Sequence, residues 1–322
     1  MRVEEGNMDS LIYSLNATVP VFLVMVVGYI LKCTGMLTEP FAKAANKFNF
    51  SVTLPAMLFV DLAATDIIGE FDPKYVLFCA GVTATMFFGL WIGARLILKD
   101  KSLVGEFVQA SYRSSAAVLG IAFIENIYGT SGMAPVMIIG CVPLYNIFAV
   151  LVLTFENDSG EDGLGHIKKS LINIAKNPII ISIALGVIAS LIRIDFPEIV
   201  DKTLSSFAKM ASPLALVTIG AGFEGRKAIA KIKPTVCVTF IKLVVLPAVF
   251  LSIAVKLGFR DEALIALIIM LGSPTTPSSY IMAKNMGHEG VLSSSAIVAT
   301  TLVSSITLTF WIFVMRALGL VM

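Results

Sequence analysis

The fold is decided by the stretch Gly272-Ser273-Pro274-Thr275-Thr276-Pro277-Ser278-Ser279-Tyr280, which lies inside a run without charged residues from Ala263 to Ala283. The run is otherwise long enough to cross a bilayer as a helix. Two prolines three residues apart each remove a backbone hydrogen bond, so we expect the helix to open near Pro274. Opened backbone is tolerated in lipid only where protein or a water-filled cavity surrounds it. The stretch therefore predicts a polar site inside the membrane, although a kinked packing helix with back-bonded hydroxyls also fits.

The composition indicates a polytopic membrane protein. Of the 322 residues, 57% are hydrophobic and 14% are charged, and the mean hydropathy is +0.89. Soluble domains carry roughly 25% charged residues. The lipid bilayer is therefore the expected surrounding of the chain. A net charge of +2 without a basic cluster gives no indication that the protein binds nucleic acid. The four cysteines and two histidines form no metal-ligand pattern and no enzyme motif is present, so we expect a protein that is not an enzyme and has no metal or cofactor.

At roughly 20 residues a span, the chain divides into ten predicted transmembrane spans joined by short connections. They cover residues 11–31, 41–62, 75–96, 107–124, 133–155, 171–192, 203–223, 234–257, 263–283 and 291–318. Cytoplasmic loops keep an excess of Lys and Arg. With the N-terminus outside, fourteen of these cations fall on the cytoplasmic side and eight on the other. We therefore expect a multi-pass protein of the plasma (inner) membrane with both termini extracytoplasmic.

Prolines recur at a fixed offset along the chain. Pro20 and Pro178 are 158 residues apart (178 − 20), and so are Pro55 and Pro213 (213 − 55). In the first pair each proline is followed eight residues later by glycine, and in the second pair each is followed three residues later by leucine. This ordered set of matches predicts an internal repeat.

The same offset brings Ser115 in the fourth span onto Ser273 in the ninth. Two halves of five spans each must be inserted in opposite directions, and inverted repeats place a substrate site at the membrane midplane between two discontinuous helices. The expected fold is all-α, with ten transmembrane helices in a 5+5 inverted repeat whose fourth and ninth helices cross. Its parts are a first repeat at residues 1–156, a polar cytoplasmic loop at 157–169 and an inverted second repeat at 170–322.

These features resemble the auxin efflux carrier family, which includes plant auxin exporters and bacterial organic-acid permeases. Residues 113–122 (Arg-Ser-Ser-Ala-Ala-Val-Leu-Gly-Ile-Ala) are similar to its first crossover, and Pro274 with residues 283–287 (Ala-Lys-Asn-Met-Gly) is similar to its second half. The resemblance covers nearly the whole chain and implies a fold like that of the antiporter NhaA and the bile-acid symporters. Ser115 and Ala122 stand where the family usually has Asn and Pro. The contacts of that Asn therefore do not carry over, and the fourth helix is expected to be less sharply broken.

The expected substrate site combines one charged group with hydroxyls, an amide and helix ends. Its members are Arg113, Ser114, Ser115, Gly120, Tyr145, Asn146, Ser273, Pro274, Thr275 and Thr276. Arg113 is the most informative of them, because a guanidinium inside a membrane is costly and rarely lacks a partner. It either binds a substrate carboxylate through its two-pronged end or snorkels to lipid phosphates. Helix N-termini at the two breaks would add N–H donors for an anion.

Two further charged residues and two alternative functions stay open. Lys242 in the eighth span is expected to be an anchor more than a ligand, whereas Asp61 is expected to be exposed outside and becomes a candidate for proton coupling if buried. The expected function is a secondary carrier of small organic anions working by alternating access. A sodium-coupled symporter of the bile-acid type would need more acidic or amide residues at the crossover. A membrane sensor would need an appended soluble domain, and a homodimer is compatible with any of these functions.

Overall fold

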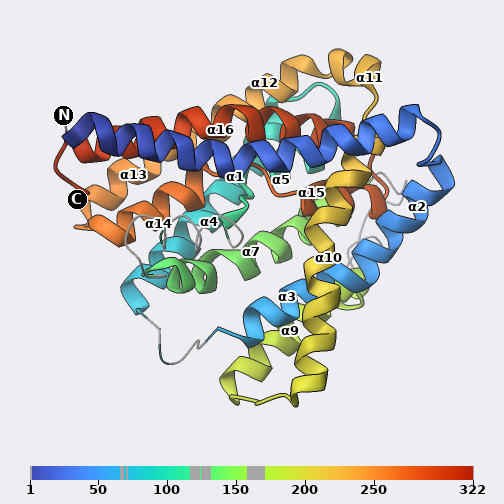
Figure 1. Ribbon diagram of the computed structural model, residues 1–322, viewed down its shortest axis with the longest axis horizontal. Coiled ribbons are helices and arrows are strands. Elements are labelled where there is room, and N and C mark those ends of the chain that lie inside the picture. The colour runs from blue at the N-terminus through green and yellow to red at the C-terminus, as the bar shows by residue number, and fades with distance from the viewer. Residues whose placement is uncertain are drawn as a thin grey trace.

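The described part of the chain is helical and has the length and apolar character of membrane spans in several helices. The computed structural model describes residues 2–65, 69, 72–116, 124, 132–157 and 171–321, and all regular structure among them is helical (Figure 1). Five helical stretches are long and apolar enough to cross a membrane by length and composition: Pro73–Ile97, Ala134–Phe155, Glu198–Gly222, Ile232–Lys256 and Val291–Ala317. Only a third of the most apolar window of Pro73–Ile97 is buried inside the protein. Its remaining apolar surface is therefore available to lipid.

The first half of the chain contains α1 (Arg2–Cys33), α2 (Glu39–Phe48), the π turn η1 (Asn49–Thr53), α3 (Leu54–Ala63), α4 (Pro73–Ile97), the 3-10 turn η2 (Lys101–Leu103), α5 (Val104–Tyr112) and α7 (Ala134–Phe155). The second half contains α9 (Pro178–Leu191), α10 (Glu198–Gly222), α11 (Gly225–Ala230), α12 (Ile232–Phe240), the π turn η3 (Ile241–Val245), α13 (Leu246–Lys256), α14 (Asp261–Gly272), α15 (Ser278–Asn285) and α16 (Val291–Ala317). Several helix starts follow from capping: Thr38, Asp72 and Asn177 each accept a backbone N–H of the next turn, and a proline lies in that turn.

Every predicted span contains helical residues. The second span is α2, η1 and α3 in succession, the eighth is α12, η3 and α13, and the ninth is divided between α14 and α15. The fourth begins as α5 and continues into residues 117–123, which lie outside the described residues. The number of membrane crossings and the inverted repeat stay predictions.

Two π turns precede prolines at the same spacing. Asn49–Thr53 runs into Leu54-Pro55, and Ile241–Val245 runs into Leu246-Pro247. Proline lacks the N–H of a regular turn and its ring crowds the turn before it, so one wider turn relieves the clash without breaking the helix. Both turns carry polar side chains in the protein interior, since Asn49 and Lys242 are fully buried.

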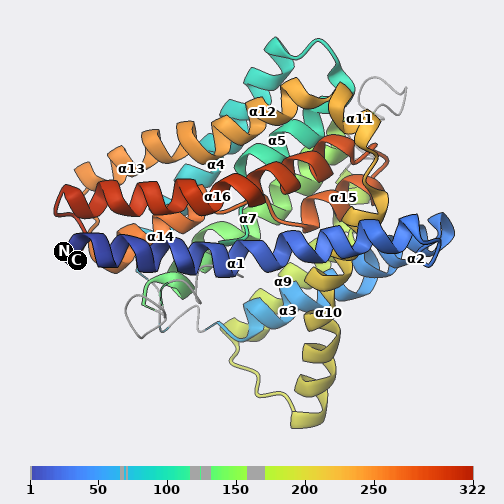
Figure 2. The same cartoon turned by 45° about the horizontal axis from the view of Figure 1, so that its top comes forward.

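The helices form two groups. In the first, α1, α2, α3, α9 and α10 pack on one another, and in the second α4, α5, α7 and α12 to α16 do so (Figures 1 and 2). Helix α1 also lies along α16. Within the first group α1 and α10 approach closely, because a Cβ added at Gly28 would overlap the backbone of Val217 and one added at Gly220 would overlap that of Met25.

Candidate functional site

Two helices are interrupted, and the interruptions touch. α5 and α14 end where the backbone becomes extended at Arg113 (φ −74°, ψ 138°) and Ser273 (φ −70°, ψ 157°). The N–H of Ser115 donates to the carbonyl of Pro274 at 3.0 Å, which joins the two open segments. Pro274 and Pro277 account for the second interruption. No proline lies in the first interruption, so its backbone is held open by other partners.

Those partners are hydroxyl groups exchanged between the two open segments. Pro274 has no N–H for the carbonyl of Met270, and the hydroxyl of Ser114 donates to that carbonyl at 2.6 Å. In return the hydroxyl of Thr275 donates to the carbonyl of Ala110 at 2.7 Å. Each helix therefore satisfies a carbonyl that the other leaves free at its end, which buried backbone requires. The fourth span, expected to be less sharply broken, leaves the helix completely at Arg113 for this reason.

Arg113 is held inside the protein, with 1% of its surface exposed. Its Nη2 donates to Asn146 Oδ1 and to Ser278 Oγ at 2.8 Å each, and its Nη1 contacts Gln109 Oε1 at 3.4 Å and Met282 Sδ at 3.1 Å. Its Nε has no hydrogen-bonding partner. None of the ion pairs among the described residues includes Arg113. The snorkelling interpretation is therefore wrong for this structure.

A small cavity brings most of the predicted site together. Arg113, Ser114, Ser115, Tyr145, Asn146 and Thr276 all line it, and its volume is about 40 Å³. The other wall is mainly apolar and comes from α3 and α9 in the first helix group, including Leu58 and Ile179. The cavity therefore lies between the two helix groups, with the interrupted helices on its polar side.

Three predicted residues lie at the crossing but do not line the cavity: Ser273, Pro274 and Thr275. The backbone and hydroxyl of Thr275 are already engaged, since its N–H donates to Thr300 Oγ1 at 3.0 Å and its hydroxyl to Ala110. Ser273 is fully buried and its hydroxyl has no partner. Gly120 lies outside the described residues. These residues build the crossing, whereas Thr276 and Ser278 present side chains to the cavity.

The sequence led us to expect that Asp61 is exposed on the extracytoplasmic side, and the structure corrects the expected exposure. Asp61 is half-buried and lines the same cavity as Arg113, from the last turn of α3. It reaches the cavity because α3 packs against α9 across from the interrupted helices. Ser278 was also missed, although it follows Pro277 in the stretch that predicted the break.

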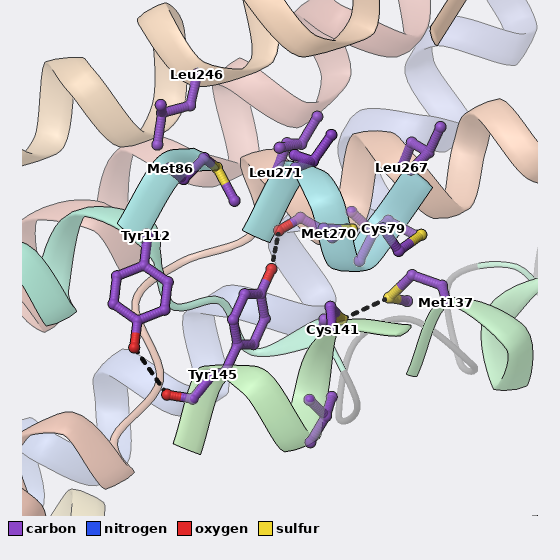
Figure 3. Packing of buried hydrophobic residues seen from close by; sticks show 14 of the residues in the cluster. Cys79, Met86, Tyr112, Met137, Cys141, Tyr145, Leu246, Leu267, Met270 and Leu271 are labelled. Carbon is purple, nitrogen blue, oxygen red and sulfur yellow. Dashed lines mark hydrogen bonds between the residues drawn. The ribbon is translucent and has the colours of Figure 1, made fainter. Parts of the chain in front are cut away.

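Lys242 is the second buried cation at the crossing. It is fully buried, and its Nζ donates to Ser114 Oγ at 2.7 Å. The Ser114 hydroxyl in turn donates to the carbonyl of Met270, which also accepts from the Tyr145 hydroxyl at 3.1 Å. Figure 3 shows Tyr145 pointing at that carbonyl, with the Tyr112 hydroxyl donating to the Tyr145 carbonyl at 2.9 Å. The expected anchor therefore holds a hydroxyl and stands directly behind the cavity wall.

Glu106, in the first turn of α5, is a buried carboxylate with hydrogen-bonding partners of its own. Glu106 accepts from the N–H groups of Gly290 and Ser293 at 2.8 Å each and so caps the start of α16. Its charge is balanced there by the positive end of the helix dipole. Glu106, Gln109 and Arg113 follow one another at spacings of three and four, which is the sequence signal of a polar helix face. That signal could have found all three.

The two buried cations therefore lack an anionic partner. The hydrogen bonds of Arg113 go to an amide, a hydroxyl and a thioether, and that of Lys242 goes to a hydroxyl. Neither side chain forms an ion pair with a described residue. Ionisable residues inside a membrane usually pair with one another or mark a substrate pathway. With Arg113 in the cavity wall and Lys242 behind it, the polar side of the cavity carries two positive charges and can receive an anion.

Comparison with known proteins gives matches along almost the whole chain. Residues 13–312 match the family model described as "Membrane transport protein". The Escherichia coli (strain K12) protein named "Uncharacterized transporter YfdV" is 25% identical over 314 residues, 95% of this chain and 99% of the relative. An "Uncharacterized transporter" of Methanothermobacter thermautotrophicus is 22% identical over 299 residues (92% and 97%). A Rhizobium meliloti protein named "Putative malonate transporter" is 23% identical over 311 residues (92% and 94%).

Proposed function

Because the chain belongs to the membrane transport protein family, which includes the auxin efflux carriers that its sequence resembles, we propose that it is a secondary carrier of small organic anions. The substrate binds where the two interrupted helices meet and crosses the membrane by alternating access. The substrate class rests on the chemistry of the cavity, and the carrier activity rests on the family.

The observation that carries this proposal is the unpaired Arg113. Burying a guanidinium without an anion costs several kcal/mol, and a chain keeps such a group only where something offsets the cost. A carboxylate entering the cavity would find a planar, permanently charged partner whose Nε makes no hydrogen bond. A charge-assisted pair of this kind is stronger than the neutral hydrogen bonds that hold Arg113 without it.

The start of α15 supplies further donors. Thr276 and Ser278 line the cavity there, and their hydroxyls are 3.2 Å apart. The backbone N–H of Thr276 makes no hydrogen bond to any described residue. Helix starts carry a partial positive charge that favours anions. These groups complement Arg113 without adding a second full charge to the wall.

The expected architecture fits this function. Discontinuous helices that meet between two helix groups are typical of carriers built as inverted repeats, in which one group moves against the other. The cavity offers room for roughly three water molecules, less than a dicarboxylate needs. We infer that α3 and α9 separate from the interrupted helices when the substrate enters. Ten spans in a 5+5 inverted repeat, extracytoplasmic termini and an inner-membrane location complete the proposal.

Malonate is the first substrate to test, because the name of one relative contains it and its carboxylates suit a cavity that has Arg113 in its wall and Lys242 behind that wall. Purified protein in detergent is titrated with malonate by calorimetry. Arg113→Met should weaken binding by about 2 to 3 kcal/mol, roughly thirty- to a hundredfold, because a charge-assisted contact is lost. Arg226→Met, which changes an exposed arginine of α11, is the matched control and should bind like the wild type.

A panel of labelled mono- and dicarboxylates is then offered to proteoliposomes containing the wild type. Saturable uptake of at least one anion supports the proposal, and its loss in Arg113→Met with unchanged thermal unfolding assigns the site. Wild-type affinity in Arg113→Met would show that the anion binds elsewhere. Failure of every anion in the panel to bind or enter would refute the substrate class.

A further inference from the structure

The carboxylate of Asp61 shares the cavity with Arg113 but is not paired with it. Asp61 comes from α3, in the first helix group, and Arg113 comes from the end of α5 in the second. The Asp61 side chain makes no hydrogen bond and no ion pair with a described residue; only its backbone carbonyl accepts, from the Thr65 hydroxyl. A carboxylate and a guanidinium thus line the same small cavity more than 4 Å apart.

Apart from Arg113 across the cavity, the surroundings of Asp61 do little to stabilise its negative charge. It is half-buried, it lacks donors, and it lies in the last turn of α3, where the helix dipole is negative. Helix α9 and the π turn η1, which pack against α3, carry no titratable side chain. The charged residues of α10 are exposed: Glu198, Asp201, Lys202 and Lys209. Among the residues that the structure describes, the titratable groups that face Asp61 are therefore Arg113 and Tyr145 across the cavity.

We propose that Asp61 couples transport to protons, so that the cavity takes up one proton with each anion and releases both together. This inference rests on the proposed function. A substrate carboxylate on Arg113 brings a second negative charge into a cavity that already holds Asp61, and two close carboxylates cannot both stay ionised at low cost. The proton comes from water in the compartment to which the cavity is open and binds a carboxylate oxygen of Asp61.

Linkage makes the effect reciprocal. If anion binding favours protonation of Asp61, protonation of Asp61 favours anion binding by the same factor. An anion gradient can then draw protons across the membrane, and an acid compartment can drive anion entry. The empty carrier returns with Asp61 facing Arg113, whose opposite charge stabilises the ionised form.

The test counts protons taken up as malonate binds. Calorimetric titrations are run at a pH where malonate is fully ionised, in two buffers with different heats of ionisation, and the difference in heat gives the protons bound. The wild type should take up about one proton for each malonate, and its affinity should fall about tenfold for each pH unit. Asp61→Asn, isosteric with the protonated acid, should take up none and lose this pH dependence. Asp61→Glu should restore proton uptake.

Asp195→Asn makes the same chemical change at an exposed site and should behave like the wild type. Malonate binding that depends on Arg113 but takes up no proton in the wild type, or equally many in Asp61→Asn, would overturn the inference and leave the proposed function standing. If no anion binds the wild type, both fall. In proteoliposomes, an inward acid gradient should accelerate malonate uptake by the wild type and not by Asp61→Asn.

Discussion

The ammonium group of Lys242 is fully buried and donates to Ser114. The ends of α5 and α14 meet beside this contact, because Ser114 in turn donates to the Met270 carbonyl. Carbonyl ends of broken helices are where secondary transporters hold cations such as sodium. Lys242 thus supplies a tethered positive charge at such a place, and this charge adds to the electrostatic potential in the cavity.

Lys242→Met tests the electrostatic part of this role. Replacing a buried cation by an apolar side chain of similar length removes a desolvation cost, so the melting temperature should stay the same or rise. The loss of a nearby positive charge should weaken malonate binding by about 1 to 2 kcal/mol, roughly five- to thirtyfold. Calorimetry and thermal unfolding measure the two effects. Lys256→Met, at the exposed end of α13, should change neither. A lower melting temperature with unchanged affinity would make Lys242 a structural anchor only.

At this scale the sequence predicted residue types better than residue roles. Arg113 could be singled out because a lone guanidinium in an apolar run demands an explanation. Thr275 could not be told from Thr276, because which hydroxyl turns to Ala110 and which to the cavity depends on the geometry of the open segment. Asp61 was misplaced because its burial depends on the packing of α3, which no local pattern records.

At the scale of elements, the sequence explains where the two π turns form. Each lies before a Leu-Pro pair, Leu54-Pro55 and Leu246-Pro247, and each carries a buried polar residue, Asn49 or Lys242. Asn49 uses its position to donate to the carbonyl of Ala211 at 2.9 Å, across to α10. An extra residue in a helical turn changes the direction of the side chains that follow, so the proline sets which polar groups face the interior.

The close contact of α1 with α10 predicts that a larger residue at Gly220 lowers the stability of the protein. A methyl group at Gly220 would overlap the backbone oxygen of Met25, so Gly220→Ala must push the two helices apart. We expect a loss of about 1 to 3 kcal/mol of stability, the usual cost of overpacking, seen as a lower melting temperature in detergent. Gly89→Ala is the matched control: nothing lies within 4 Å of its added methyl group, and alanine favours a helix. Equal melting temperatures for the two variants would contradict the close packing.

The breaks in the helices were predictable to different degrees. Two prolines in nine residues predicted where α14 ends, because proline acts locally on its own helix. The end of α5 has no such local cause. It depends on hydroxyls and an N–H that exchange with the ninth span, more than 150 residues away in sequence, and the offset between Ser115 and Ser273 was the only sign of that pairing.

At the scale of the whole molecule, the cavity lies where the two helix groups meet. Its apolar wall belongs to α3 and α9, and its polar wall belongs to the interrupted helices. Relative movement of the groups would therefore change access to the cavity without breaking the hydrogen bonds between the two open segments, since those bonds lie within the second group. The binding groups stay assembled while the apolar wall moves. The repeated prolines Pro20, Pro55, Pro178 and Pro213 lie in α1, α3, α9 and α10, so the sequence marked the helices of the first group. It could not predict that α3 and α9 are the two that face the crossing.

The arrangement of the chain ends bears on the direction of insertion. The start of α1 and the end of α16 lie at the same end of the molecule in both views (Figures 1 and 2), as an even number of crossings requires. The excess of Lys and Arg in alternate connections predicts that this end faces outward. Single-cysteine variants can test it in a background that lacks the four native cysteines. Suitable positions are Met36, between α1 and α2 and 72% exposed, Ile194, between α9 and α10, and Leu318, just after α16.

A membrane-impermeant maleimide added to intact cells should label Ile194→Cys and Leu318→Cys, and it should label Met36→Cys only after the cells are permeabilised. The reverse pattern would invert the orientation and assign the cytoplasmic face to the end where the chain begins and finishes. Labelling of Met36→Cys and Leu318→Cys from the same side would contradict the ten-span topology itself. Because the start of α1 lies at the same end of the molecule as the end of α16, α1 would then fail to cross the membrane, and five spans could not precede the second half. The inverted repeat needs that odd number, so this one experiment tests both the direction of insertion and the symmetry from which the crossing was predicted.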